Sequence, residues 1–402
     1  MFNSKTKAFK IIGRKKPLFE SEIKKREKEI LEVIGGSKIL VIGGAGSIGQ
    51  AVCNEVYKRY PKELNVVDIS ENNLVELVRD LRSQDLEHFS PLRTFAIDFA
   101  SKEFEMMLAE YGPYDYVFNL SAMKHVRSEK DPYTLMRMLD VNIFNTVNSI
   151  NLLRSTEIKK YFYVSTDKAT NPVNLMGASK RVAEMYLCQL SEQITISSSR
   201  FANVAFSDGS LLHGFENRLK KRQPMSLPLD VKRYFITQEE AGQLCVLSAI
   251  FGENRDIFFP QMDDELELTS FKDICTRFLN EHGFEPIYFD NENEARKKMH
   301  LIEAEKKYPV HIFKSDTSGE KKFEEFYSIS DELGISDFEN IGIVKMPLLG
   351  KNLKLKLKNF EEQIEKIKAS DVWQKSQIVN QISNLLPSFK HIETGKNLDQ
   401  RM

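Results

Sequence analysis

The sequence predicts an α/β protein with a doubly wound parallel sheet, a smaller C-terminal domain and helical extensions at both ends. Three observations support this fold class. Short runs of β-branched and aromatic residues alternate with helical periodicity over residues 37–203. A glycine-rich turn at 43–49 joins the first of these strands to a helix. The length of 402 residues leaves room for a second domain.

Composition excludes several classes of protein. The net charge of −1 gives no basic field that would attract nucleic acid. No stretch approaches the ~18 apolar residues of a membrane span, and the basic segment Met1–Lys16 lacks the apolar core of a secretory signal. We therefore expect a cytoplasmic protein without a metal site, because its cysteines lie far apart and read as reduced thiols: Cys53, Cys188, Cys245 and Cys275.

The first 36 residues predict a helical arm. Apolar residues recur at roughly helical spacing through 17–34 among many charges, and Gly35-Gly36 ends the pattern. We interpret this segment as a surface helix packed on the main domain, and a dimerisation arm is the alternative.

The glycine-rich turn predicts a site for a dinucleotide. A short β-branched run at Lys38–Ile42 leads into the turn, and a helical pattern follows to about Tyr60. Glycines allow backbone N–H groups to approach a pyrophosphate at the start of a helix, where the dipole favours negative charge. A plain tight turn is the alternative. The residues expected to bind the cofactor here are Gly43, Gly46, Ser47, Ile48 and Gly49.

The next strand, Leu64–Val67, ends at Asp68, which lies at the expected distance to accept a hydrogen bond from a ribose hydroxyl. A carboxylate here repels the 2′-phosphate of NADP, so the sequence predicts NAD as the cofactor. The alternative is an N-cap-like role at the helix that begins near Ser70, and both roles can hold together.

A polar segment follows the buried strand Tyr161–Val164. Thr166, Asp167 and Lys168 are predicted at the carboxyl end of this strand, where open α/β sheets bind ligands. Asn171-Pro172 then breaks the chain. Met176 and Lys180 are four residues apart and would share one face of the following helix.

This segment resembles the short-chain dehydrogenase/reductase superfamily, whose catalytic helix carries Tyr-x-x-x-Lys. Met176 stands at the tyrosine position and Lys180 at the lysine position. The Ser-Thr-Asp-Lys-Ala and Met-Gly-Ala-Ser-Lys-Arg segments are similar to those of the soluble UDP-N-acetylglucosamine 4,6-dehydratases of bacterial polysaccharide synthesis. The resemblance runs from about Lys38 to Phe326 and implies a Rossmann-type sheet, a nucleotide-sugar substrate and a homo-oligomer.

The resemblance also implies a reaction, the dehydration of a nucleotide-activated N-acetylhexosamine to its 4-keto-6-deoxy sugar. Asp167 would be the acid at C6 and Lys168 the base at C5. Thr166 would bond the C4 hydroxyl, and Lys180 would hold the nicotinamide ribose. A thioether cannot accept a proton, so Met176 cannot replace the tyrosine chemically. A similar methionine occurs in relatives that retain the C5 configuration, which predicts retention here.

Further contacts follow from the resemblance alone. Asp98 would contact the adenine region, although a strand-end turn residue is an equal interpretation. Lys124 would bind the sugar or a phosphate. His125 would position the substrate by hydrogen bonding, with an acid or base role as the alternative, and Asn142 would support the catalytic helix. The expected substrate ligands near the end of the resemblance are Asn203, Arg233 and Glu320.

The predicted organisation has four parts: a helical arm at 1–36, a cofactor-binding domain with the catalytic segment at 37–203, a nucleotide-sugar-binding domain at 204–350, and a helical appendage at 351–402. Two other functions remain open from the sequence. One is a nucleotide-sugar 4-epimerase. The other is a non-catalytic dinucleotide-binding regulator, which the missing tyrosine would favour.

Overall fold

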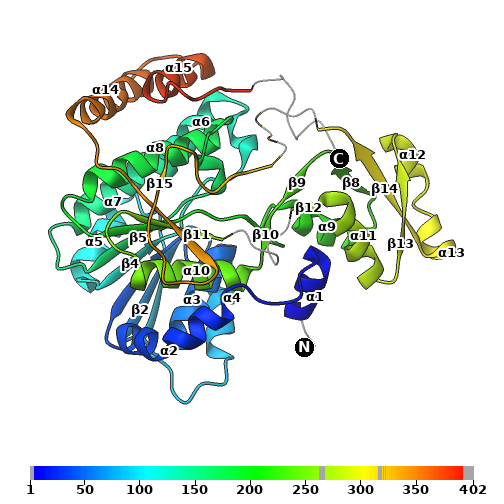
Figure 1. Ribbon diagram of the computed structural model, residues 1–402, viewed down its shortest axis with the longest axis horizontal. Helices are drawn as coiled ribbons and strands as arrows, with labels where there is room; N and C mark the ends of the chain where they lie inside the picture. The colour runs from blue at the N-terminus through cyan, green and yellow to red at the C-terminus, as the bar shows by residue number, and fades with distance from the viewer. Residues whose placement is uncertain (1–3, 262–267, 316–318, 320, 322, 393–402) are drawn as a thin grey trace.

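The computed structural model describes residues 4–261, 268–315, 319, 321 and 323–392. The chain forms a large lobe around one extended sheet and a smaller lobe beside it (Figure 1). This arrangement confirms the predicted α/β class with a doubly wound sheet and a smaller second unit. Glu320 lies outside the described residues.

The large sheet has nine strands in the order β15-β16-β11-β6-β5-β4-β1-β2-β3. The strands from β3 to β11 are parallel, and β16 and β15 run antiparallel to their neighbours. The strand order reverses between β1 and β4, which places a ligand crevice at their carboxyl ends. The strands are β1 (Lys38–Ile42), β2 (Glu63–Asp68), β3 (Leu92–Ala96), β4 (Tyr116–Asn119), β5 (Lys160–Val164), β6 (Ile196–Ser199), β11 (Asp256–Pro260), β15 (Glu332–Leu333) and β16 (Ile341–Lys345).

Helices cover both faces of this sheet and bury two apolar cores. The helices that share the first core with one face are α2 (Glu20–Gly35), α3 (Ser47–Tyr57), α4 (Glu71–Arg82) and α10 (Gln238–Phe251). Those that share the second core with the other face are α5 (Lys102–Tyr111), α6 (Pro132–Leu139), α7 (Asn145–Leu153), α8 (Leu175–Leu190), α14 (Lys351–Lys368) and α15 (Lys375–Leu385). The parallel strands are apolar on both faces for this reason.

The smaller lobe has its own core and a three-stranded parallel sheet in the order β13-β14-β8. Its strands are β8 (Met225–Pro228), β13 (Glu285–Phe289) and β14 (Lys307–Phe313), and its helices are α9 (Leu211–Lys220), α11 (Phe271–Glu281), α12 (Glu292–Lys297) and α13 (Leu301–Glu305). Two short pairs connect the lobes: β7 (Asn203–Val204) with β10 (Phe235–Ile236), and β9 (Lys232–Arg233) with β12 (Thr269–Ser270).

The predicted boundary at residue 204 needs correction. After a first excursion into the smaller lobe, the chain returns to the large lobe as α10 and β11, and it returns again as β15 and β16. The predicted unit 204–350 is therefore not one continuous domain. The physical reason is that β6 would otherwise be an exposed edge, and β11 and β16 extend the sheet beyond it.

The N-terminal arm packs on the protein's own chain. Its second helix, α2, buries Ile30 and Ile34 in the large lobe, as the surface-helix interpretation expects. Its first helix, α1 (Ser4–Ile12), lies instead on α11 of the smaller lobe. Between them Arg14 forms a buried pair with Glu240, with nitrogen–oxygen distances of 2.6 and 2.8 Å.

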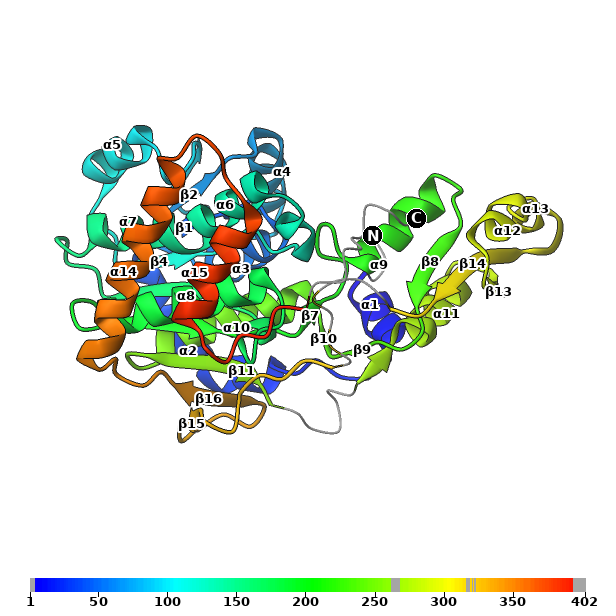
Figure 2. The same cartoon turned by 90° about the horizontal axis from the view of Figure 1, so that it is seen from above.

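The C-terminal appendage is a pair of helices that covers α6, α7 and α8 (Figures 1 and 2). Phe360 of α14 stacks on Phe144, with ring centroids 6.1 Å apart. Tyr186 of α8 donates a 3.0 Å hydrogen bond to the carbonyl of Leu357. Across the part of the chain that the structure describes, no helix is long and apolar enough to span a bilayer.

Candidate active site

The glycine-rich turn requires glycine at two positions. Gly43 has φ of +72°, and a Cβ there would lie 2.6 Å from the backbone nitrogen of Ser121. A Cβ on Gly49 would overlap the carbonyl oxygen of Gly43. Gly46 is the N-cap of α3 and brings no side chain to it, so the first amides of α3 are available to a ligand's phosphates.

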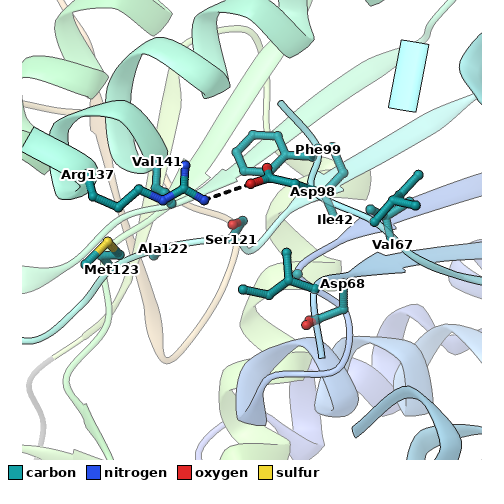
Figure 3. Close-up of a pocket in the computed structure, with 13 residues that line it drawn as sticks. Ile42, Val67, Asp68, Asp98, Phe99, Ser121, Ala122, Met123, Arg137 and Val141 are labelled. Carbon is teal, nitrogen blue, oxygen red and sulfur yellow. Dashed lines mark hydrogen bonds and ion pairs between the residues drawn. The ribbon is translucent and has the colours of Figure 1, made fainter. Parts of the chain in front are cut away.

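A pocket of about 160 Å³ lies between the ends of β1, β2, β3 and the turn after β4 (Figure 3). Asp68 accepts hydrogen bonds from the amides of Ala45 and Ser70, both at 2.9 Å. Asp68 lines the pocket and joins the glycine turn to the loop before α4 through these two hydrogen bonds. The N-cap of α4 is Ser70, whose hydroxyl accepts from the amide of Asn73, so Asp68 supports the residue before the helix and is not itself the cap. The binding of a ribose hydroxyl by Asp68 stays a prediction.

Asp98 lines the same pocket and pairs with Arg137, whose Nη2 lies 2.7 Å from Asp98 Oδ2. Figure 3 shows the Arg137 side chain pointing toward Asp98. Burial opposes ionisation of Asp98, but the amide of Ala100 and the guanidinium of Arg137 outweigh it and lower its pKa. Sequence reasoning missed Arg137, because only the fold brings α6 to this strand end.

A larger cavity of about 340 Å³ opens beside this pocket, at the carboxyl ends of β1, β4, β5 and β6. The structure brings thirteen of the predicted site residues to its wall: Gly43, Gly46, Ser47, Ile48, Gly49, Lys124, His125, Thr166, Asp167, Lys168, Met176, Lys180 and Asn203. Residues far apart in sequence meet here because parallel strands end at the same edge of the sheet.

Asp167 and Lys168 form an ion pair on a short 3₁₀ turn (Asp167–Ala169) after β5. Lys168 Nζ lies 3.0 Å from Asp167 Oδ1 and donates to Asn203 Oδ1 at 3.4 Å. The hydroxyl of Thr166 donates to the same Asp167 oxygen at 2.9 Å. Burial favours a neutral Lys168, but the carboxylates of Asp167 and Glu324 offset it and raise its pKa, so the free protein holds an ammonium.

Glu324 is a site residue that sequence reasoning missed. Its side chain is buried, and its Oε1 lies 3.9 Å from Lys168 Nζ. Burial raises its pKa, which the nearby ammonium only partly opposes. The sequence signal was a Glu-Glu pair at 324–325 in a charged segment, which does not show which member is buried.

Arg233 lies off the cavity wall. It is buried, and it donates a 2.9 Å hydrogen bond to the carbonyl of Lys232. The positive charge of Arg233 disfavours the protonated form of both Lys168 and Glu324, so it opposes the rise in their pKa values. Arg233 therefore adds positive charge near the Asp167–Lys168 pair.

Lys180 points from α8 toward β5. Its ammonium donates to the Tyr163 hydroxyl at 2.9 Å and to the Val164 carbonyl at 3.0 Å. Burial lowers the pKa of Lys180 to about 7, although the charge of Glu184 opposes this. Met176 lies one turn earlier and is buried at 3% exposure, with part of its side chain on the cavity wall.

Lys124 and His125, which follow β4, also line the cavity. The protein atoms around them lower the pKa of each by desolvation, although both stay accessible to solvent. The charges of Lys124 and Arg127 lower the pKa of His125 further, so this histidine is neutral and can accept a hydrogen bond at neutral pH.

A buried ionic network lies next to the 3₁₀ turn Asp167–Ala169. Glu184 of α8 accepts two hydrogen bonds from Arg200, at 2.9 and 2.8 Å, and one from Ser165 at 2.7 Å. Arg200 also donates to the Phe326 carbonyl at 2.8 Å and to Asp331 at 3.1 Å. The network ties the ends of β5 and β6 to the segment that carries Glu324.

Comparison with known proteins gives the family. Residues 39–331 match the family described as polysaccharide biosynthesis protein, so the chain belongs to that family. It is 28% identical over 325 residues to the probable polysaccharide biosynthesis protein EpsC of Bacillus subtilis, covering 77% of this chain but 52% of that one. It is 25% identical over 316 residues to the inverting UDP-N-acetylglucosamine 4,6-dehydratase of Campylobacter jejuni strain 81-176, covering 77% and 87% of the two chains.

Solved structures share the fold. Pen from Bacillus thuringiensis superposes with a TM-score of 0.65 at 23% identity, covering 88% of this chain and 98% of that one. The Bordetella bronchiseptica enzyme WbmF, solved in complex with NAD⁺, gives a TM-score of 0.50 at 16% identity over 67% and 88% of the two chains. These matches support the doubly wound α/β fold that the sequence predicts.

Proposed function

We propose that the protein is an NAD-dependent 4,6-dehydratase of a nucleotide-activated N-acetylhexosamine, with UDP-N-acetylglucosamine as the best candidate. The observation that carries the proposal is the Asp167–Lys168 pair at 3.0 Å on the cavity wall, beside Lys180 and the glycine turn. A dehydration needs an acid and a base at adjacent carbons, and an epimerase or a regulator does not.

The pocket residues fit NAD. The α3 amides would bind the pyrophosphate, Asp68 the adenosine ribose, and Lys180 the nicotinamide ribose. Bound NAD would accept the C4 hydride and later return it to C6. WbmF, which shares the fold, was solved with the same cofactor.

The hydroxyl of Thr166 supports a route for the proton of the C4 hydroxyl. Thr166 donates to Asp167 Oδ1 at 2.9 Å, so a proton received from C4 can pass on to Asp167. Protonated Asp167 is then the acid that C6 requires. This route needs no side chain at the position of Met176.

Neutralising Asp167 also prepares the base. The negative charge of Asp167, which is the first of the two that raise the pKa of Lys168, is then lost. Glu324, whose Oε1 lies 3.9 Å from Lys168 Nζ, receives the ammonium proton after the two groups move to hydrogen-bond distance. Neutral Lys168 removes the C5 proton while Asp167 protonates the departing C6 hydroxyl. The Lys168 ammonium, whose other two protons have come from solvent, then delivers one proton to C5, and Lys168 recovers one from Glu324, so the protons balance and only water is lost.

The retained C5 configuration remains part of the proposal, as do a homo-oligomeric state and a cytoplasmic location. If Lys168 removes the C5 proton and delivers one of its ammonium protons to the same face, the configuration is kept. The relative from Campylobacter jejuni is named as inverting, so the stereochemical outcome distinguishes the two proteins.

The test is incubation of the purified protein with NAD and UDP-N-acetylglucosamine in D₂O, followed by mass spectrometry and NMR. We expect loss of one water, deuterium at C5 and ring-proton couplings of the retained isomer. Asp167→Asn should cut turnover about 10²–10⁴-fold, while the exposed Asp80→Asn should leave it unchanged. A product of unchanged mass would favour the 4-epimerase. Cofactor binding without turnover of any nucleotide sugar would favour the regulator.

A further inference from the structure

The hydroxyl of Tyr163 lies between the predicted cofactor lysine and the backbone of a neighbouring helix. Tyr163 is fully buried on β5. Its oxygen accepts from Lys180 Nζ at 2.9 Å, and it donates to the carbonyl of Asn142, also at 2.9 Å. A phenol has one hydrogen to donate, and here it is given to a backbone carbonyl, so the oxygen's free electron pairs face the ammonium.

The Asn142 carbonyl is held in place by its surroundings. It belongs to the π-helical turn Asp140–Phe144, where the α-helical hydrogen-bond pattern is interrupted between α6 and α7. The Asn142 side chain bonds both backbone groups of Met123, at 2.9 and 3.1 Å, and the hydroxyl of Ser179 at 2.9 Å. Three hydrogen bonds of the Asn142 side chain therefore hold the residue whose carbonyl accepts the Tyr163 proton.

Lys180 has few other partners among the described residues. Its ammonium bonds the Val164 carbonyl and lies 4.3 Å from the centroid of the Tyr163 ring. The charged group that acts on it is Glu184, on its own helix, and Glu184 is already bonded to Arg200 and Ser165. On β5 its titratable neighbour is Tyr163, and the π-helical turn contributes the neutral Asn142.

We propose that Tyr163 is a positioning residue that holds the Lys180 ammonium in its place and in its charged form for cofactor binding. The proposal rests on the role given to Lys180 under the proposed function. Removal of the hydroxyl would take away a neutral acceptor from a buried ammonium, and burial would then favour the neutral amine more strongly.

The same strand supplies a matched comparison. Tyr161 lies two residues earlier, faces the same side of β5 and is equally buried. Its hydroxyl accepts from Asn119 Nδ2 and pairs with Ser149, both at 2.8 Å, and it does not reach Lys180. Tyr161→Phe therefore removes a buried, bonded phenol without affecting the lysine.

The experiment compares NAD affinity by titration calorimetry from pH 6 to pH 9 in Tyr163→Phe, Tyr161→Phe and the wild type. We expect about a tenfold loss of affinity at pH 8 in Tyr163→Phe, in line with loss of a hydrogen bond to a charged group. Its affinity should also begin to fall at a lower pH than in the wild type. Tyr161→Phe should keep both the affinity and the pH profile. Equal behaviour of the two variants would overturn the inference.

Lys180→Met separates this inference from the proposed function. If Lys180→Met binds NAD normally, the cofactor role of the lysine is wrong. If Lys180→Met loses affinity and Tyr163→Phe does not, only the role of Tyr163 is wrong. Should Tyr163→Phe fail to fold, 3-fluorotyrosine at position 163 replaces it. Fluorine makes the phenol oxygen a weaker acceptor for the Lys180 ammonium, so NAD affinity should begin to fall at a lower pH than in the wild type, and an unchanged pH profile would overturn the inference.

Discussion

Glu184→Gln should destabilise the protein without touching the cavity wall. Glu184 is 1% exposed and accepts two hydrogen bonds from Arg200, which is itself fully buried. Glutamine keeps the shape but removes the charge, and its amide nitrogen would face a guanidinium nitrogen. Arg200 would then be a buried cation with Asp331 as its remaining carboxylate partner.

The magnitude follows from two independent arguments. Breaking one partner of a buried ion pair typically costs about 3–5 kcal/mol. Burial alone would raise the pKa of Glu184, but Arg200, Arg181 and Ser165 lower it to about 2. An unfolded glutamate titrates near about 4.3, so the shift corresponds to stability of order 3 kcal/mol. We therefore expect Glu184→Gln to lose about 3 kcal/mol of unfolding free energy at pH 7.

The assay is equilibrium urea unfolding followed by circular dichroism at several pH values. The pKa of Glu184 is lower in the folded protein, so its contribution is complete above the unfolded pKa and is lost as pH falls toward about 2. The gap between wild type and Glu184→Gln should be constant above pH 5 and shrink below it. Glu192→Gln is the control, because its pair with Lys354 is partly exposed and should be worth under about 1 kcal/mol.

Two results would refute this reasoning. If Glu184→Gln lowered the unfolding free energy by less than about 1 kcal/mol, the buried network would stabilise the fold less than its burial indicates. A gap that stays constant from pH 7 to pH 3 would mean that the carboxylate of Glu184 is not the group that titrates.

Three further predictions concern the site. Asp68→Ala should narrow the preference for NAD over NADP and also weaken NAD binding, measured by titration with both cofactors, because two amides lose their acceptor; equal wild-type affinities would refute the assignment. Glu324→Gln should lower turnover by at least about tenfold, whereas the exposed neighbour in Glu325→Gln should not; equal rates would exclude the proton transfer from Lys168. Met176→Ala should stay within about tenfold of wild-type turnover, roughly 1.4 kcal/mol in the barrier; a larger loss, or product inverted at C5, would count against the retaining assignment.

The sequence predicted the cofactor half of the sheet well. Lys38–Ile42 was predicted as a strand and is β1 with the same bounds, and Tyr161–Val164 lies within β5. Short apolar runs between helical patterns give such signals locally. Parallel strands end at one edge of the sheet, which is why Thr166, Asp167 and Lys168 could be predicted at a ligand site. Lys180 and Asn203 were assigned to the site through the family resemblance.

The parts that were missed depend on long-range pairing. The run at 256–260 becomes β11 only because β6 lies beside it, and β16 pairs with β11 from about 85 positions later in the chain. Tyr163 reads as one more aromatic residue in a strand until Lys180 reaches back to it. The substrate contact predicted at Glu320 lies outside the described residues and stays a prediction.

The helices α14 and α15 are synthesised long after α8, the helix whose surface they cover. The outer surface of α8, which carries Lys180, is completed by residues from Leu357 to Leu385. At about 5–20 residues per second, a ribosome that has finished α8 needs roughly ten seconds or more to supply that cover. During this interval the apolar outer surface of α8 is exposed to water. A nascent chain halted before residue 351 would therefore be an incompletely packed intermediate with exposed apolar surface. A chaperone that binds apolar surface would have the most time to bind α8 at this stage.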